Sequence, residues 1–214
     1  MKHIVLTLIL IFFLNCSNKK TVQLPEIELA KISEVKDVSV AYLFYDETQP
    51  DSVLLNRKNL ISTTNWLVNV DKRLTLKQAI PHIKFLQDKK IASSHKNENA
   101  KNYFTCHDLR TGSLGFVEFT DVNFNIDQNV LDFGENLSGD QTTINISSNS
   151  IHNEHLIDDL NDLVKSSFEF HAQQIVVLLN FDKNMTFQEY IEANLKLDSL
   201  GNSRFHINNN QFFN

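Results

Sequence analysis

Apolar and polar residues alternate along this chain with two different periods, which together predict a mixed α/β fold. Short runs rich in β-branched and aromatic residues are typical of strands. This pattern is found in VSVAYLFY (38–45), SVLLN (52–56), NWLVNV (65–70), NYFTCHD (102–108), GFVEFTDVNFNI (115–126), TTINIS (142–147), QQIVVLLNF (173–181) and SRFHI (203–207). Apolar residues at helical spacing predict helices after Thr75, after Thr186 and in NEHLIDDLNDLVKSSF at 153–168.

One phrase occurs twice in the chain. LVNVDKRLTLKQAI begins at Leu67 and LLNFDKNMTFQEYI begins at Leu178, with identical residues at six of the fourteen positions. Each copy reads as a strand, a tight turn and a helix, because Thr75 and Thr186 are each followed three residues later by Gln or Glu, the spacing of a capping box. The fold class is therefore α/β or α+β, with two related subdomains that each contain a β-α-β unit.

The apolar pattern also predicts how the chain is divided. We expect a signal peptide at 1–15, a polar tether at 16–34, a first subdomain at 35–126, a linker at 127–141 and a second subdomain at 142–214. The linker is polar and contains two of the five glycines of the chain. The second subdomain reads as strand, helix, strand, helix, strand.

The N-terminus resembles the signal of a bacterial lipoprotein. Lys2 precedes an apolar run of 11 residues that ends at Leu14, whereas a membrane-spanning helix needs about 18 residues or more. The run is followed by Asn15-Cys16, so we expect Cys16 to be lipidated and to anchor the chain in a membrane. An ordinary signal or an uncleaved anchor is the alternative.

Composition narrows the classes of function. The formal net charge of −6 disfavours a nucleic-acid binder, which would carry a basic surface. With 42% hydrophobic residues and 16 Phe, the chain can form a substantial core. If Cys16 carries lipid, Cys106 is the only remaining thiol, and no disulfide can form within one chain.

The second subdomain resembles the periplasmic domain of the ExbD/TolR biopolymer-transport family. The features that carry the resemblance are the helix Leu156–Val164, the strand end at Asp182-Lys183, the helix after Thr186, and Gly201 before a last strand. The resemblance implies a similar fold, a tendency to form homodimers, and binding to envelope proteins, peptides or cell wall. Family members also have a transmembrane helix with an Asp, which this sequence lacks, so a role in proton-driven transport is not implied.

Two groups of residues are candidates for chemistry. His152, Glu154, His155, Asp158 and Asp159 are close in sequence, but acidic residues are common in the first turns of helices, and no H-E-x-x-H motif is present. Cys106 and His107 are adjacent on a predicted strand, where neighbouring side chains point to opposite faces. We therefore expect no metal and no cofactor, a buried Cys106 and an exposed His107.

The Asp-Lys pairs of the repeated phrase are the candidate site for a partner. Asp71-Lys72 and Asp182-Lys183 lie at predicted strand ends, where binding crevices form in open α/β sheets. If the two strands are parallel neighbours, both pairs emerge at the same edge; the alternative is that they are solvated turn residues. We expect a non-catalytic lipoprotein of the bacterial cell envelope that faces the periplasm, binds a protein or peptide and serves as an accessory to biopolymer transport. The alternative is a cell-wall or peptide hydrolase.

Overall fold

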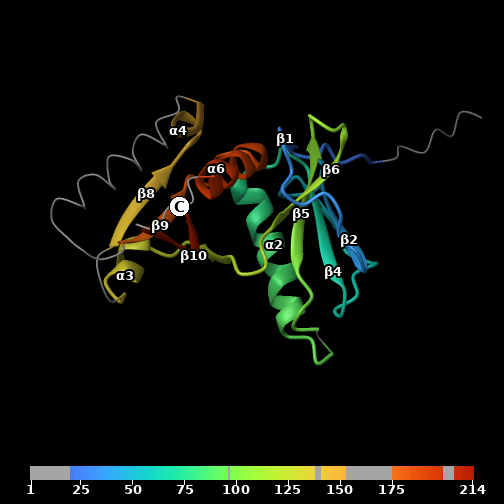
Figure 1. Cartoon of the computed structure of the whole chain (residues 1–214), viewed down its shortest axis with the longest axis horizontal. Coiled ribbons are helices and arrows are strands. Elements are labelled where there is room, and N and C mark those ends of the chain that lie inside the picture. Colours follow the sequence, from blue (N-terminus) through green and yellow to red (C-terminus); the bar gives the residue numbers. More distant parts are fainter. Residues whose placement is uncertain (1–19, 96, 138–140, 153–174, 200–204) are drawn as a thin grey trace, which may run out of the picture.

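Two β-sheets lie on either side of a pair of helices (Figure 1). The computed structural model describes residues 20–95, 97–137, 141–152, 175–199 and 205–214. Its mixed α/β content confirms the fold class expected from the sequence.

The first sheet is mixed and is built around the strand β5. Its order is β1-β5-β4-β2-β3, and β6 is a further strand that pairs with β5. Strands β1, β5, β4 and β2 are parallel, whereas β3 and β6 are antiparallel to their neighbours. The strands are β1 (Glu26–Ile27), β2 (Val38–Tyr45), β3 (Val53–Asn56), β4 (Asn65–Val70), β5 (Asn102–Asp108) and β6 (Ser113–Glu118).

The second sheet is entirely parallel, in the order β7-β10-β9-β8. Its strands are β7 (Asn123–Ile126), β8 (Gln141–Ile146), β9 (Ile175–Phe181) and β10 (Phe205–Phe213). The short helix α3 (Val130–Gly134) packs on the outer face of this sheet, where Val130 and Phe133 contact Leu178 and Phe212. A second short helix, α4 (Ser148–His152), follows β8.

The helices α2 (Leu76–Ile91) and α6 (Phe187–Ser199) lie between the sheets. Both bury the apolar face that the sequence predicted, and one continuous core cluster includes residues from both helices and both sheets. Aromatic rings join the two halves of this core. Phe104 of β5 packs edge-to-face against Phe187 and Tyr190 of α6, and Tyr190 in turn packs against Phe181 of β9.

The two halves share one topology. In each half, three parallel strands lie side by side in chain order, β2-β4-β5 and β8-β9-β10, and the last two are joined through α2 or α6. The register agrees as well. Leu43 pairs with Val70 in the first half and Ile146 pairs with Phe181 in the second, and Val70 and Phe181 are equivalent positions of the repeat. The repeated phrase is therefore the sequence signature of a repeated β-β-α-β unit.

Two segments differ from the expected elements. Residues 115–126, expected as one strand, form parts of two strands in different sheets, because the chain turns after Phe119. The Gln87 side chain stabilises this turn by donating to the carbonyl groups of Phe119 and Val122. The last strand, β10, extends to Phe213, six residues beyond the end of the run SRFHI that predicted it.

The sheets also depart from the expected division of the chain. The strand β1 lies within residues 16–34 but pairs with β5, and β7 lies within 35–126 but pairs with β10. The helix α3 lies within the expected linker 127–141. The helix expected at 153–168 lies outside the described residues.

Candidate functional site

The two turns of the repeated phrase lie against each other. Four backbone hydrogen bonds join them, two in each direction. Each bond from the first turn to the second has a counterpart in the opposite direction, and the donors of the two bonds lie 111 residues apart, as do the acceptors. The bonds are Leu76 N to Met185 O (2.8 Å), Phe187 N to Leu74 O (2.7 Å), Lys77 N to Lys183 O (2.8 Å) and Gln188 N to Lys72 O (3.3 Å). The first amides of a helix have no partner within their own helix. Each turn therefore caps the helix of the other copy, and the contact has an approximate twofold symmetry.

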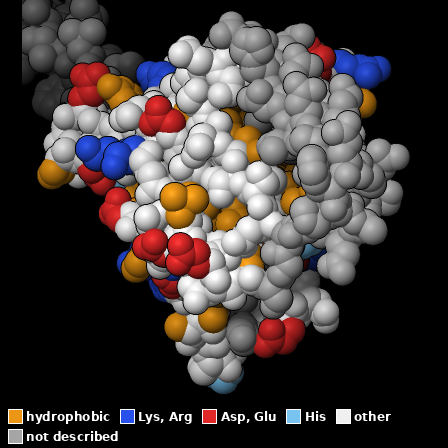
Figure 2. Space-filling model, turned by 90° about the vertical axis from the view of Figure 1, so that its left-hand side faces the viewer, with side chains coloured by type: hydrophobic (Ala, Val, Ile, Leu, Met, Phe, Trp, Pro, Cys, Tyr) orange, Lys and Arg blue, Asp and Glu red, His pale blue; other side chains and the backbone are white. Residues whose placement is uncertain are grey.

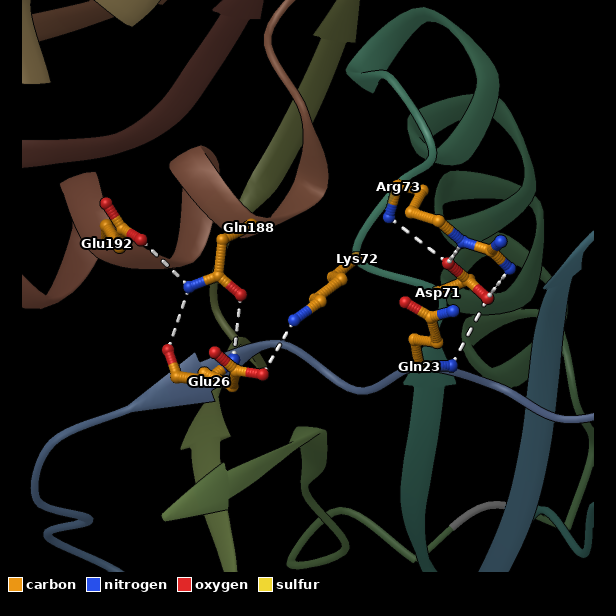
Figure 3. Close-up of polar contacts among 7 residues, drawn as sticks. All are labelled: Gln23, Glu26, Asp71, Lys72, Arg73, Gln188 and Glu192. Atoms are coloured by element: carbon orange, nitrogen blue, oxygen red, sulfur yellow. Dashed lines mark hydrogen bonds and ion pairs between the residues drawn. The ribbon is translucent and has the colours of Figure 1, made fainter. Parts of the chain in front are cut away.

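Asp71 is fully buried within this contact. Its carboxylate accepts hydrogen bonds from Nε and Nη2 of Arg73 at 2.8 Å each, from the Arg73 backbone at 3.1 Å and from the Gln23 backbone at 3.2 Å (Figure 3). Burial by itself would raise the pKa of Asp71, but the hydrogen bonds from Arg73 and Gln23 hold it below its ordinary value. The Arg73 guanidinium also stacks on the Tyr45 ring, 4.8 Å from its centroid.

An N-terminal segment, residues 20–32, crosses both turns, and we call it the strap. Gln23 O accepts from Lys72 N at 2.7 Å, and the Glu26 carboxylate accepts from Lys72 Nζ at 2.6 Å, which lowers the pKa of Glu26. The backbone of Glu26 exchanges two hydrogen bonds of 2.8 Å with the Gln188 side chain on α6 (Figure 3). At its start, Lys20 forms an ion pair with Asp46.

Asp182 and Lys183 have simpler surroundings. Both are partly exposed, and among the described residues the Asp182 carboxylate accepts only from the backbone and side chain of Asn184, at 2.8 and 2.9 Å. The strands that precede the two pairs, β4 and β9, belong to different sheets, so the pairs do not line one sheet edge as parallel neighbours would. Of the four candidate partner-binding residues, Asp71 and Lys72 are engaged by the strap, whereas Asp182 and Lys183 have no ion pair among the described residues.

Cys106 and His107 point to opposite faces of β5, as expected. Cys106 is buried in the core and His107 is exposed. Burial raises the pKa of the Cys106 thiol to about 12, so it is protonated near neutral pH.

The candidate metal cluster falls almost entirely outside the described residues. His152 ends α4, while Glu154, His155, Asp158 and Asp159 are not described. Within the described ranges, no three His, Cys, Asp or Glu side chains come close enough to hold a metal ion.

A cleft lies between the strap, β6, α6 and the second sheet. It has a volume of about 330 Å³ and continues into a more open hollow of about 660 Å³, with Ile27, Lys31 and Leu195 bordering both. The side chains along the cleft are mostly apolar: Ile27, Ala30, Ile32, Phe116, Val117, Leu179, Leu195, Leu197 and Ile207. The hollow adds Leu29 and Leu109, which are 56% and 54% exposed. The ion pair between Lys31 and Asp198 lies where the two meet.

Two polar side chains that line the cleft, Asn194 and Gln211, are bonded to each other and to the buried Tyr190, and the charged side chains that line it, Lys31, Glu118 and Asp198, all form ion pairs. The Tyr190 hydroxyl donates to Gln211 Oε1 at 2.7 Å, and Gln211 Nε2 donates to Asn194 Oδ1 at 3.0 Å. Asn194 Nδ2 then donates to the Tyr190 carbonyl at 2.7 Å. This arrangement leaves the cleft suited to an apolar group rather than to acid–base chemistry.

The sequence interpretation missed the strap and the cleft that it borders. One local signal was present, because Glu26-Ile27-Glu28-Leu29 alternates polar and apolar residues as a strand does. The pairing of Glu26 with Gln188 spans 162 residues and has no local signal.

Comparison with known proteins finds no matching family model, no matching curated protein and no matching solved structure. No described helix is long and apolar enough to cross a membrane.

Proposed function

We propose that this chain is a non-catalytic binding protein of the bacterial cell envelope, which holds an apolar segment of a partner protein or peptide in the cleft between the strap and α6. The observation that carries the proposal is the chemistry of the cleft. Most of its lining side chains are apolar, Asn194 and Gln211 bond to each other and to Tyr190, and the charged Lys31, Glu118 and Asp198 are all in ion pairs. Exposed apolar residues at its rim, Leu29 and Leu109, extend the apolar surface to solvent.

The geometry of the cleft favours an apolar partner segment of modest size. A volume of about 330 Å³ accepts one or two large side chains, and the adjoining hollow of about 660 Å³ leaves room for the backbone that bears them. Charged residues at the rim, Glu28, Glu192 and Lys196, can select a partner without contributing much to its affinity.

The envelope location rests on Cys16 and on the resemblance of residues 142–207 to the ExbD/TolR periplasmic domain. In this proposal the lipid on Cys16 anchors the body at the periplasmic side of a membrane, as an accessory to biopolymer transport. The strap begins at Lys20, which pairs with Asp46. Four residues of extended chain span only ~14 Å, so the anchor would hold the body close to the bilayer surface.

The cleft is tested by photocrosslinking in living cells. A photoreactive amino acid at position 195 should give a discrete protein adduct, because Leu195 borders both parts of the cleft. The matched control is position 131, since Leu131 is 63% exposed on α3 and does not border the cleft. The same adducts from both positions, or none from position 195, would contradict the proposal.

The anchor is tested by metabolic labelling with a fatty-acid analogue. The wild type should be labelled and recovered with membranes, whereas Cys16→Ser should be neither. Equal labelling of the two proteins would exclude lipidation at Cys16.

A further inference from the structure

Three asparagine side chains form a continuous row across the outer face of the second sheet. Asn214 Nδ2 donates to Asn180 Oδ1 at 2.8 Å, and Asn180 Nδ2 donates to Asn145 Oδ1 at 2.7 Å. Asn145 and Asn180 are register partners on β8 and β9, and the row continues to Asn214, which directly follows β10. All the hydrogen bonds therefore run in one direction, which polarises the row.

This row borders a hollow of about 620 Å³. The hollow is also lined by Asp127, which precedes α3, by the 63% exposed Leu131 of α3, and by Thr143 of β8, which lies two residues before Asn145 on the same face. Asp127 has a left-handed backbone with φ of 55°. Asp adopts this conformation more readily than most residues, and Asp37 and Ser52 share it.

Several polar groups of the hollow have no partner among the described residues. At one end of the row, Asn145 Nδ2 does not donate, and at the other end, Asn214 Oδ1 does not accept. The Thr143 hydroxyl and the Asp127 carboxylate are similarly without partners in the described part of the chain. The hollow thus offers amide donors, amide acceptors, a hydroxyl and one carboxylate.

The charge of the hollow narrows the class of ligand. Asp127 is its only ionisable side chain among the described lining residues, so anions such as phosphates and carboxylates are disfavoured. Hydroxyl groups both donate and accept, and neighbouring hydroxyls complement a row of amides and a carboxylate. We propose that this hollow is a binding site for a neutral ligand with adjacent hydroxyl groups, that is, a sugar. The volume is in the range of small-molecule sites.

The first half of the molecule shows that the row is not needed for the fold. Asn69 is the equivalent of Asn180, but it is buried, and its Nδ2 donates to the Ala41 carbonyl at 3.1 Å. The positions that correspond to Asn145 and Asn214 are Tyr42 and His107. The same β-β-α-β unit therefore forms without an amide row, and the row is a property of the second half alone.

The proposal is tested by NMR of the side-chain amides during titration with glucose, galactose, N-acetylglucosamine and maltose. At least one sugar should cause saturable shifts of the Asn145, Asn180 and Asn214 amide signals at millimolar concentrations. Asn180→Ala removes the centre of the row and should weaken this binding about tenfold or more, the effect of losing one or two hydrogen bonds. The matched control is Asn210→Ala, because Asn210 pairs with Asn125 and Asn208 in the same sheet, outside the hollow, and its loss should leave sugar binding unchanged.

Three results would overturn the sugar site. The first is the absence of saturable shifts with all four sugars, and the second is equal binding by Asn180→Ala and the wild type. The third is binding of inorganic phosphate or of the peptide mimic N-acetylglycine methylamide at least as tightly as any sugar. The hollow and the cleft have no residue in common, so these results do not depend on the outcome of crosslinking at Leu195.

Discussion

Asp71 and Asp182 hold the same place in the two copies of the repeated phrase, but the structure gives them different surroundings. The Asp71 carboxylate is fully buried and accepts four hydrogen bonds, three of them from Arg73. The Asp182 carboxylate is partly exposed, and Asn184 is its only partner in the part of the chain that the structure describes. Position in the repeat therefore does not decide the role of the residue.

This difference predicts that Asp71→Ala and Asp182→Ala lower the free energy of unfolding by different amounts. Asp71→Ala leaves the Gln23 amide and the Arg73 guanidinium without their acceptor, which should lower the free energy of unfolding by about 1–3 kcal/mol. Asp182→Ala is the matched control and should change it by no more than about 0.5 kcal/mol, as for most surface substitutions. Urea unfolding measures both values. Equal changes in the free energy of unfolding for the two variants would show that the strap does not hold the Asp71 carboxylate.

Lys90 on α2 is an unusual lysine, because only 7% of it is exposed. Its ammonium donates to the Ala100 and Lys101 carbonyls at 3.3 and 3.1 Å and to Asn102 Oδ1 at 2.8 Å. It also lies over the Trp66 ring, 5.1 Å from the centroid. Lys90 thus fixes the connection between α2 and β5, and burial lowers its pKa from 10.5 to about 8.

This shift predicts how stability depends on pH. Between pH 8 and 10.5 the unfolded chain binds more protons at Lys90 than the folded chain does, so this residue makes the free energy of unfolding rise with pH. In Lys90→Met this contribution to the rise should be absent. When the pH is raised from about 7 to about 9.5, the free energy of unfolding of the wild type should therefore increase relative to that of Lys90→Met. Lys89→Met, at the exposed neighbouring position, should retain the rise. A constant difference between wild type and Lys90→Met over this range would contradict the assignment.

At the scale of elements, the sequence predicts best where local chemistry decides the structure. The helices α2 and α6 begin at the predicted capping boxes, where Thr75 N donates to Gln78 Oε1 at 2.9 Å and Thr186 N donates to Glu189 Oε2 at 2.7 Å. The strands β2, β4, β5 and β9 follow the β-branched and aromatic runs that predicted them.

Elements that depend on distant residues could not be predicted in this way. Residues 115–126 are apolar enough for one strand, and they divide into β6 and β7 because Gln87, on a helix earlier in the chain, stabilises a turn between them. The strand β1 has only two residues and forms because β5 offers a free edge beside them. The cleft is composed of the strap, β6 and the second half of the chain, so no single segment of sequence encodes it.

In the molecule as a whole, the contact between the two copies of the repeated phrase joins the two related halves. Four cross-repeat hydrogen bonds and a common aromatic core join the halves, and the strap crosses the contact from outside. One chain thus contains two copies of the unit in contact, and their covalent linkage raises the effective concentration of each half for the other. The cleft proposed to bind a partner exists only because the halves are held in this arrangement.

The most direct test of this account is native-state hydrogen exchange at the amides of Leu76 and Phe187. Each amide is in the first turn of a helix, where it would normally have no partner and exchange rapidly. Here Leu76 donates to Met185 O and Phe187 donates to Leu74 O, at 2.8 and 2.7 Å. We expect both amides to be as strongly protected as those of β4 and β9, and to lose protection together when Asp71→Ala destabilises the contact. Rapid exchange of both amides in the wild type would contradict the claim that the repeated phrase joins the two halves.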